Sequence, residues 1–109
     1  MYYYLALSAT VVATLLCAAP ANAEDYVLTL KGNQFSPKEL TIPANQKVKI
    51  TVKNSDSTPA EFESSDLSRE KLVGANSEIS MFVGPLDAGK YGFFDDFHRD
   101  ATTGTLIVK

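Results

Sequence analysis

The chain has 109 residues, a formal net charge of −3 and 45% hydrophobic residues. This length allows one domain, and mild acidity without a basic stripe or an aromatic–basic platform excludes a nucleic-acid-binding protein. With one histidine, no Gly-x-Ser-x-Gly motif and no glycine-rich phosphate loop, the sequence also excludes a hydrolase and a small organic cofactor.

The N-terminal segment differs in composition from the rest of the chain. Residues 1–19 carry no charged side chain, and Pro20 is followed by the A-x-A sequence Ala21-Asn22-Ala23. This pattern predicts a signal peptide over residues 1–23, a periplasmic location and a mature domain over 24–109. An uncleaved membrane anchor is the alternative, because the apolar run is just long enough to be considered. Cys17 leaves with a cleaved signal, so the domain has no disulfide.

The rest of the chain consists of short strand patterns separated by turn residues. The clearest is 46–53, where Val48, Ile50 and Val52 alternate with polar residues, as in a half-buried antiparallel strand. Residues 66–73 are ambiguous between one helical turn and an irregular crossover. We expect strands over 25–30, 39–42, 46–53, 60–63, 77–83, 89–95 and 103–108. About seven strands and at most one short helical turn predict an all-β Greek-key sandwich or barrel.

The stretch 89–98 carries the most distinctive polar residues. Tyr91 and Phe93 alternate on an inward face, and the same alternation turns Asp95 inward at the strand end, three residues before His98. An inward carboxylate needs a cation, backbone donors or a metal ion to offset its desolvation. Two interpretations remain open. Asp95 and His98 are metal ligands, or Asp95 caps the loop through backbone N–H groups while His98 is partly exposed.

The order of motifs along the mature chain resembles the cupredoxin fold. The similarity is greatest to cupredoxin-like proteins of bacterial periplasmic iron uptake, namely the EfeO-type cupredoxin domain and stand-alone iron-transport cupredoxins. The resemblance rests on Phe35-x-Pro37, Pro43-Ala44-Asn45, Glu61-Phe62-Glu63-Ser64-x-x-Leu67-x-Arg69-Glu70-Lys71, Tyr91-x-Phe93, Phe97-His98 and Gly104-Thr105-Leu106.

The blue-copper ligand set of this fold is His, Cys, His and a weak axial Met, and the chain departs from it. Ala60 stands at the first histidine position and Asp95 at the cysteine position, while His98 keeps the second histidine. The region of the methionine, near Thr102 and Thr103, has none. The resemblance therefore implies a non-blue site whose carboxylates and imidazole suit copper(II), iron, manganese or zinc.

Three further carboxylates are candidate metal ligands. The resemblance implies a ligand at Glu61, with Glu63 and Asp96 as additional oxygen donors. Alternation opposes this, because a buried Phe62 turns both glutamates outward unless a bulge re-aims one of them. The other interpretation is a surface network in which Glu63 and Glu70 pair with Arg69 or Lys71.

The resemblance implies a function in iron uptake. The expected cofactor is a copper ion, an iron ion or both, and the expected partner is an iron permease or another periplasmic iron-uptake component. Oxidation of ferrous iron is one expected activity, and simple metal buffering is another. The alternative from a different class is a metal-free interaction module that binds a periplasmic partner through its aromatic-rich end.

Overall fold

The computed structural model describes residues 25–109, so the predicted signal peptide lies outside the described residues. The described chain contains nine strands and one 3-10 turn. They are β1 (Asp25–Lys31), β2 (Gln34–Ser36), β3 (Glu39–Ile42), β4 (Val48–Asn54), β5 (Ala60–Ser64), β6 (Arg69–Val73), β7 (Ser77–Val83), β8 (Gly89–Asp95), η1 (Asp96–His98) and β9 (Thr103–Val108).

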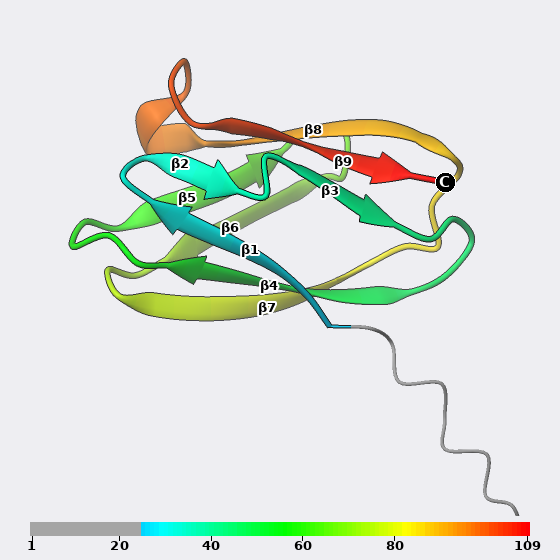
Figure 1. Cartoon of the computed structure of the whole chain (residues 1–109), viewed down its shortest axis with the longest axis horizontal. Helices are drawn as coiled ribbons and strands as arrows, with labels where there is room; N and C mark the ends of the chain where they lie inside the picture. Colours follow the sequence, from blue (N-terminus) through cyan, green and yellow to red (C-terminus); the bar gives the residue numbers. More distant parts are fainter. Residues whose placement is uncertain (1–24) are drawn as a thin grey trace, which may run out of the picture.

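The strands form two sheets that stack as the layers of a sandwich (Figure 1). One sheet has the order β2-β1-β4-β7, and the other has the order β3-β9-β8-β5-β6. The expected all-β sandwich is confirmed, but its sheets are mixed rather than purely antiparallel. β4 runs antiparallel to β7 and parallel to β1, and β3 runs parallel to β9. The prediction of an antiparallel pairing for 46–53 was therefore right for only one of its two neighbours.

Two strands were not predicted, and both lie at the edge of a sheet. β2 is only three residues long, and β6 replaces the helical turn or crossover considered for 66–73. An edge strand is hydrogen-bonded on one side only, and most β6 side chains remain accessible to solvent. Its sequence therefore lacks the period-two pattern that a half-buried strand shows. The helical turn forms instead at η1.

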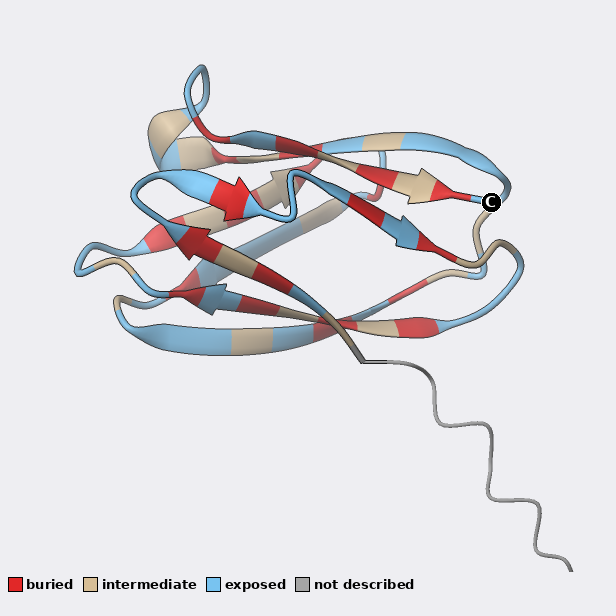
Figure 2. Cartoon of the chain, in the orientation of Figure 1, coloured by how far each residue is buried: buried red, intermediate tan, exposed pale blue. Residues whose placement is uncertain are grey.

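The core lies between the sheets, where buried and exposed residues alternate along the strands (Figure 2). Val48, Ile50 and Val52 point inward as predicted, and Met81 is a core residue. Phe35, Phe62 and Phe93 pack together, with ring centroids 5.0 Å apart for Phe35–Phe93 and 5.3 Å for Phe62–Phe93. This cluster adjoins the strand end that carries Asp95, because Phe62 and Asp95 are cross-strand partners.

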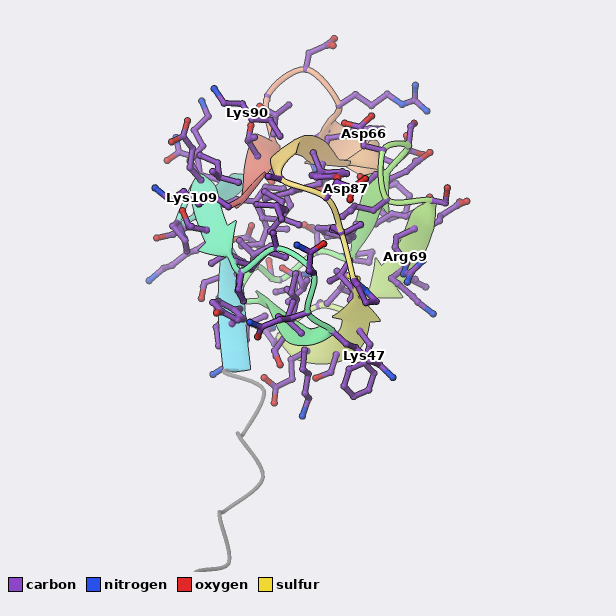
Figure 3. All side chains as sticks on the ribbon, turned by 90° about the vertical axis from the view of Figure 1, so that its right-hand side faces the viewer. Lys47, Asp66, Arg69, Asp87, Lys90 and Lys109 are labelled. Carbon is purple, nitrogen blue, oxygen red and sulfur yellow. The ribbon has the colours of Figure 1, made fainter. Side chains whose placement is uncertain are left out.

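One end of the sandwich, here called the η1 end, carries η1 and the loops 32–33, 55–59 and 99–102 (Figure 1). Side chains join these loops. The Asp56 carboxylate accepts hydrogen bonds from the backbone N–H groups of Gly32 and Asn33, and the Thr102 hydroxyl donates to the Asn33 carbonyl. The opposite end carries Lys47 and Lys109 (Figure 3). Within residues 25–109, no helix has the length and apolar character that a membrane crossing requires.

The turn between β5 and β6 is held by side chains rather than by regular pairing. The Ser64 hydroxyl donates to the Gly92 carbonyl at 2.6 Å, and the Asp66 carboxylate accepts from the Gly92 N–H at 2.8 Å. Asp66 lies within this turn, and Arg69 begins β6 directly after it (Figure 3). These bonds fix β5 and β6 against β8, and so they fix the outward-facing side chains of the β5–β6 hairpin.

Candidate metal centre

Asp95 ends β8 with its side chain inside the sandwich, where it is 1% exposed. Its Oδ1 accepts hydrogen bonds from the backbone N–H groups of Glu61 at 3.0 Å and Phe97 at 3.1 Å. Its Oδ2 lies 2.9 Å from Nδ1 of His98. The carboxylate therefore caps η1 and ties it to β5, and hydrogen bonds to an ionised acceptor are stronger than neutral ones. The capping interpretation of Asp95 is seen directly, while a role as metal ligand stays a prediction.

His98 is held by Asp95 and reaches the surface with 36% of its side chain exposed. With Nδ1 donating to the carboxylate, the lone pair of a neutral ring lies on Nε2, for which the described structure shows no hydrogen bond. A carboxylate that orients a histidine in this way is the usual partner of a metal-binding imidazole.

The position where a blue-copper protein would hold its ion is filled by internal contacts. Ala60 is buried and contributes only a methyl group, and Asp95 is engaged with three donors. Thr102 is fully buried, its hydroxyl donating to Asn33 and its carbonyl accepting from the Asp95 N–H. No thiolate or thioether reaches this point in the described chain. The residues therefore do not fit a blue-copper ion.

Glu61 and Glu63 lie on the outer face of the five-stranded sheet. The burial of β5 alternates strictly, with Ala60, Phe62 and Ser64 inside. Pairing with β6 continues without interruption through Glu61↔Leu72 and Glu63↔Glu70, so no bulge re-aims either glutamate. The sequence-based prediction that both glutamates point outward was correct, so their side chains lie on the face of the sheet opposite to Asp95.

The hairpin register adds a third carboxylate that the sequence analysis did not treat as a ligand. Glu70 lies opposite Glu63, and one carboxylate oxygen from each of Glu61, Glu63 and Glu70 lies within 4.8 Å of the others. We call these three residues the glutamate triad. The sequence alone does not place Glu70 beside Glu61 and Glu63, because this requires knowing that residues 69–73 pair with residues 60–64.

The triad carboxylates affect one another's protonation. A hydrogen bond to the Glu70 carboxyl raises the pKa of Glu61, and desolvation and the charges of Glu70, Asp96 and Glu63 act in the same direction. The pKa of Glu63 is raised by desolvation and then by the charges of Asp96 and Glu70. Carboxylates this close repel one another unless a proton or a cation lies between them.

Asp96 begins η1, and its charge acts on the carboxylates of Glu61 and Glu63. Asp96 is partly exposed and forms an ion pair with Arg99. The expected network of Glu63 and Glu70 with Arg69 or Lys71 is not seen. The Arg69 guanidinium instead donates to backbone carbonyls, including that of Phe82 at 3.0 Å. Among residues 25–109, the ion pairs are His98–Asp95 and Arg99–Asp96.

The structure thus divides the predicted site into two groups. Asp95 and His98 form a hydrogen-bonded pair at the η1 end, and Glu61 and Glu63 form the triad with Glu70 on the sheet surface. Asp96 begins η1 directly after Asp95, and its charge acts on Glu61 and Glu63. The triad offers three hard oxygen donors and no nitrogen or sulfur ligand, a set that suits hard multivalent cations.

The raised pKa values predict a pH dependence of stability. A glutamate whose pKa is higher in the folded state than its ordinary 4.5 binds protons more tightly when folded. Proton binding to these glutamates therefore stabilises the ion-free protein fully below pH 4.5, and this contribution to the free energy of unfolding is lost as the pH rises. We expect the metal-free Glu70→Gln protein to be as stable as the wild type at low pH and more stable at neutral pH. Urea unfolding at each pH measures the difference. Glu39→Gln, at the opposite edge of the same sheet, is the matched control. A Glu70→Gln difference that does not grow with pH would contradict the expectation.

Comparison with known proteins places the chain in a family. Residues 4–108 match the cupredoxin-like domain. The chain is 39% identical over 87 residues to an uncharacterized protein of Rickettsia prowazekii, a match that covers 80% of this chain and 70% of the relative.

Solved structures with the same fold include three cupredoxins. Auracyanin A, a blue copper protein of Chloroflexus aurantiacus, superposes with a TM-score of 0.67 at 19% identity, covering 78% of this chain and 98% of that one. A purple cupredoxin from Nitrosopumilus maritimus gives 0.63 at 22% identity, covering 78% and 100%. Amicyanin from Paracoccus versutus gives 0.64 at 18% identity, covering 84% and 87%. The sandwich described above is the cupredoxin fold, and the protein belongs to the cupredoxin-like domain family.

Proposed function

We propose that this protein is a periplasmic metal-binding cupredoxin that holds a copper or iron ion through the glutamate triad and acts in iron uptake. The observation that carries the proposal is the convergence of the Glu61, Glu63 and Glu70 oxygens within 4.8 Å. This arrangement is unfavourable for three ionised side chains alone, and a multivalent cation relieves it. Family membership supports a metal ion, because auracyanin A, of the same fold, is a copper protein.

The residues have separate tasks in this proposal. Glu61, Glu63 and Glu70 supply the oxygen ligands, and Asp96 adds negative charge at the margin of the site. Asp95 and His98 hold η1, and with it Asp96, against β5. A bound redox-active ion would supply one-electron chemistry, while the protein supplies the ligand set and its position. The triad lies on an open sheet surface, which suits an ion that is received and passed on.

The role in iron uptake rests on the resemblance of the Glu61–Lys71 segment to iron-uptake cupredoxins and on the signal-like N-terminus. In this role the protein would receive ferrous iron, hold it or pass its electron to a bound copper(II) ion, and deliver the iron to a membrane permease or another periplasmic component. Mass spectrometry of the protein from the periplasmic fraction checks the location and the cleavage after Ala23.

Metal titration tests the site. We expect the wild type to bind copper(II), and ferrous iron under exclusion of oxygen. We expect Glu70→Gln or Glu61→Gln to bind at least about 10-fold more weakly, which is the smallest loss usual even for an outer-shell partner of a metal site. Isothermal titration calorimetry measures both. Glu39→Gln removes the same charge at the far edge of the sheet and should bind as the wild type does. If His98→Ala abolishes binding while the triad variants do not, the ion lies at the η1 end instead.

Two further outcomes separate the candidate activities. Ferrous iron that is oxidised faster with the protein than in buffer supports oxidation, and an unchanged rate with tight binding supports delivery or buffering. If no ion binds, the interaction module becomes the better hypothesis. Phe97 favours that module, because its ring on η1 is 49% exposed at the end where Phe94 is also partly accessible.

A further inference from the structure

Arg99 lies near the triad, and its guanidinium contacts the Asp96 carboxylate and the Phe94 ring. Its Nε–H donates to Oδ1 of Asp96, and its guanidinium carbon lies 5.5 Å from the centroid of the Phe94 ring. Phe94 is the cross-strand partner of Glu63. Arg99 therefore lies over the same outer sheet face as Glu63, and it approaches the carboxylates from η1.

The charge of Arg99 acts on the triad as well as on Asp96. It opposes the rise in the pKa of Glu63, which desolvation, Asp96 and Glu70 cause. In turn, the pKa of Arg99 is raised by its hydrogen bond to Asp96 and by the charges of Asp96, Glu63 and Asp100. Arg99 thus occupies the part of this surface that a cation favours, although its own side chain is 65% exposed.

We propose that Arg99 is a displaceable counter-ion of the metal site, which stabilises the ion-free carboxylates and is released from Asp96 when a multivalent ion binds. This inference rests on the proposed function. An exposed ion pair contributes little to stability, so its rupture is a small cost for an ion that contacts several carboxylates. A monovalent ion has no such advantage over a guanidinium. Arg99 therefore favours multivalent ions at the triad.

Arg69 provides an internal contrast. Its guanidinium donates to three backbone carbonyls and forms no ion pair in the described chain, so it holds the β5–β6 turn and the edge of β7 together. The two arginines near the hairpin thus differ in role. Only Arg99 is bonded to a carboxylate through a contact that an incoming ion can replace.

The test uses Zn²⁺ as a diamagnetic probe with the full chain. We expect Arg99→Gln to bind Zn²⁺ about two- to five-fold more tightly than the wild type, the fold-change that corresponds to the ion-pair energy. Arg99→Lys keeps the charge and should restore an affinity close to that of the wild type. Lys90→Gln, with the same charge change roughly 17 Å along β8 from Asp95, should leave the affinity unchanged. Calorimetry measures the dissociation constants.

Nuclear magnetic resonance supplies a second readout that a purely structural role would not change. We expect the Arg99 Nε–H resonance of the wild type to shift on addition of Zn²⁺, and the Arg69 resonance to stay in place. Equal dissociation constants for the wild type and Arg99→Gln, with an unchanged Arg99 resonance, would overturn this inference and leave the metal site intact. Absence of Zn²⁺ binding in both proteins would overturn the metal site and the inference together.

Discussion

Replacing Asp95 with alanine is expected to lower the free energy of unfolding by about 3 kcal/mol, because buried hydrogen-bonding groups lose their partner. The Asp95 carboxylate serves the N–H groups of Glu61 and Phe97 and the ring of His98, and it is 1% exposed. Its removal leaves these donors without an acceptor and detaches η1 from β5. Urea unfolding followed by circular dichroism measures the loss.

Two variants make the Asp95 result specific. Asp95→Asn keeps an oxygen at the Oδ1 position, which accepts both backbone N–H bonds, so it should lose less than half as much stability. Asp96→Ala removes a neighbouring, partly exposed carboxylate and should change stability by no more than about 0.5 kcal/mol. Asp95→Ala with the stability of Asp96→Ala would show that the capping bonds are dispensable. A folded Asp95→Asn protein that has lost its affinity for copper(II) would instead indicate that Asp95 is a ligand.

Replacing Phe93 with alanine should have the largest effect on stability, about 3–5 kcal/mol, because it removes the centre of the aromatic cluster and leaves a cavity. Phe93 is buried and packs edge-on against Phe35 and obliquely against Phe62. On its other side the ring fills the space over Gly104, where any Cβ would collide with it. Gly104 therefore has no side chain that could fill the cavity from that side.

The same unfolding measurement tests this prediction. Phe97→Ala is the matched control, because Phe97 is an exposed phenylalanine four residues further along and should cost no more than about 0.5 kcal/mol. Phe93→Leu keeps most of the volume and should lose clearly less than Phe93→Ala. Equal stabilities of Phe93→Ala and Phe97→Ala would show that the aromatic cluster does not hold the sheets together.

The predicted and missed strands differ in how they are buried. A strand such as β4 has one face in the core, so its side chains alternate and the sequence reveals it. β2 alternates exposed and buried side chains but has only three residues, which is too short for a two-residue period to show, and most side chains of β6 remain accessible to solvent without alternation. Neither strand therefore appears in the pattern. The missing β6 also concealed Glu70 as a neighbour of Glu63.

The sequence predicted which way the side chains of the candidate site point, but not which groups they contact. Alternation alone turned Asp95 inward and Glu61 and Glu63 outward, and the burial of β5 and β8 agrees. The partners of these side chains come from distant segments. The N–H group that Asp95 caps belongs to Glu61, which is 34 positions away. Such pairings depend on strand order and register, which cannot be predicted from a single sequence.

The sequence by itself determined the class of fold, the inward carboxylate at the end of 89–95 and the absence of a blue-copper ligand set. The first two follow from side-chain chemistry and a two-residue period, which are local properties, and the third follows from the cupredoxin resemblance. Only the tertiary structure decided that Asp95 is satisfied by three donors, and that Glu61, Glu63 and Glu70 converge on the opposite side of the sheet. The physical reason is that cross-strand neighbours are set by register, and a register is fixed by packing of the whole sandwich.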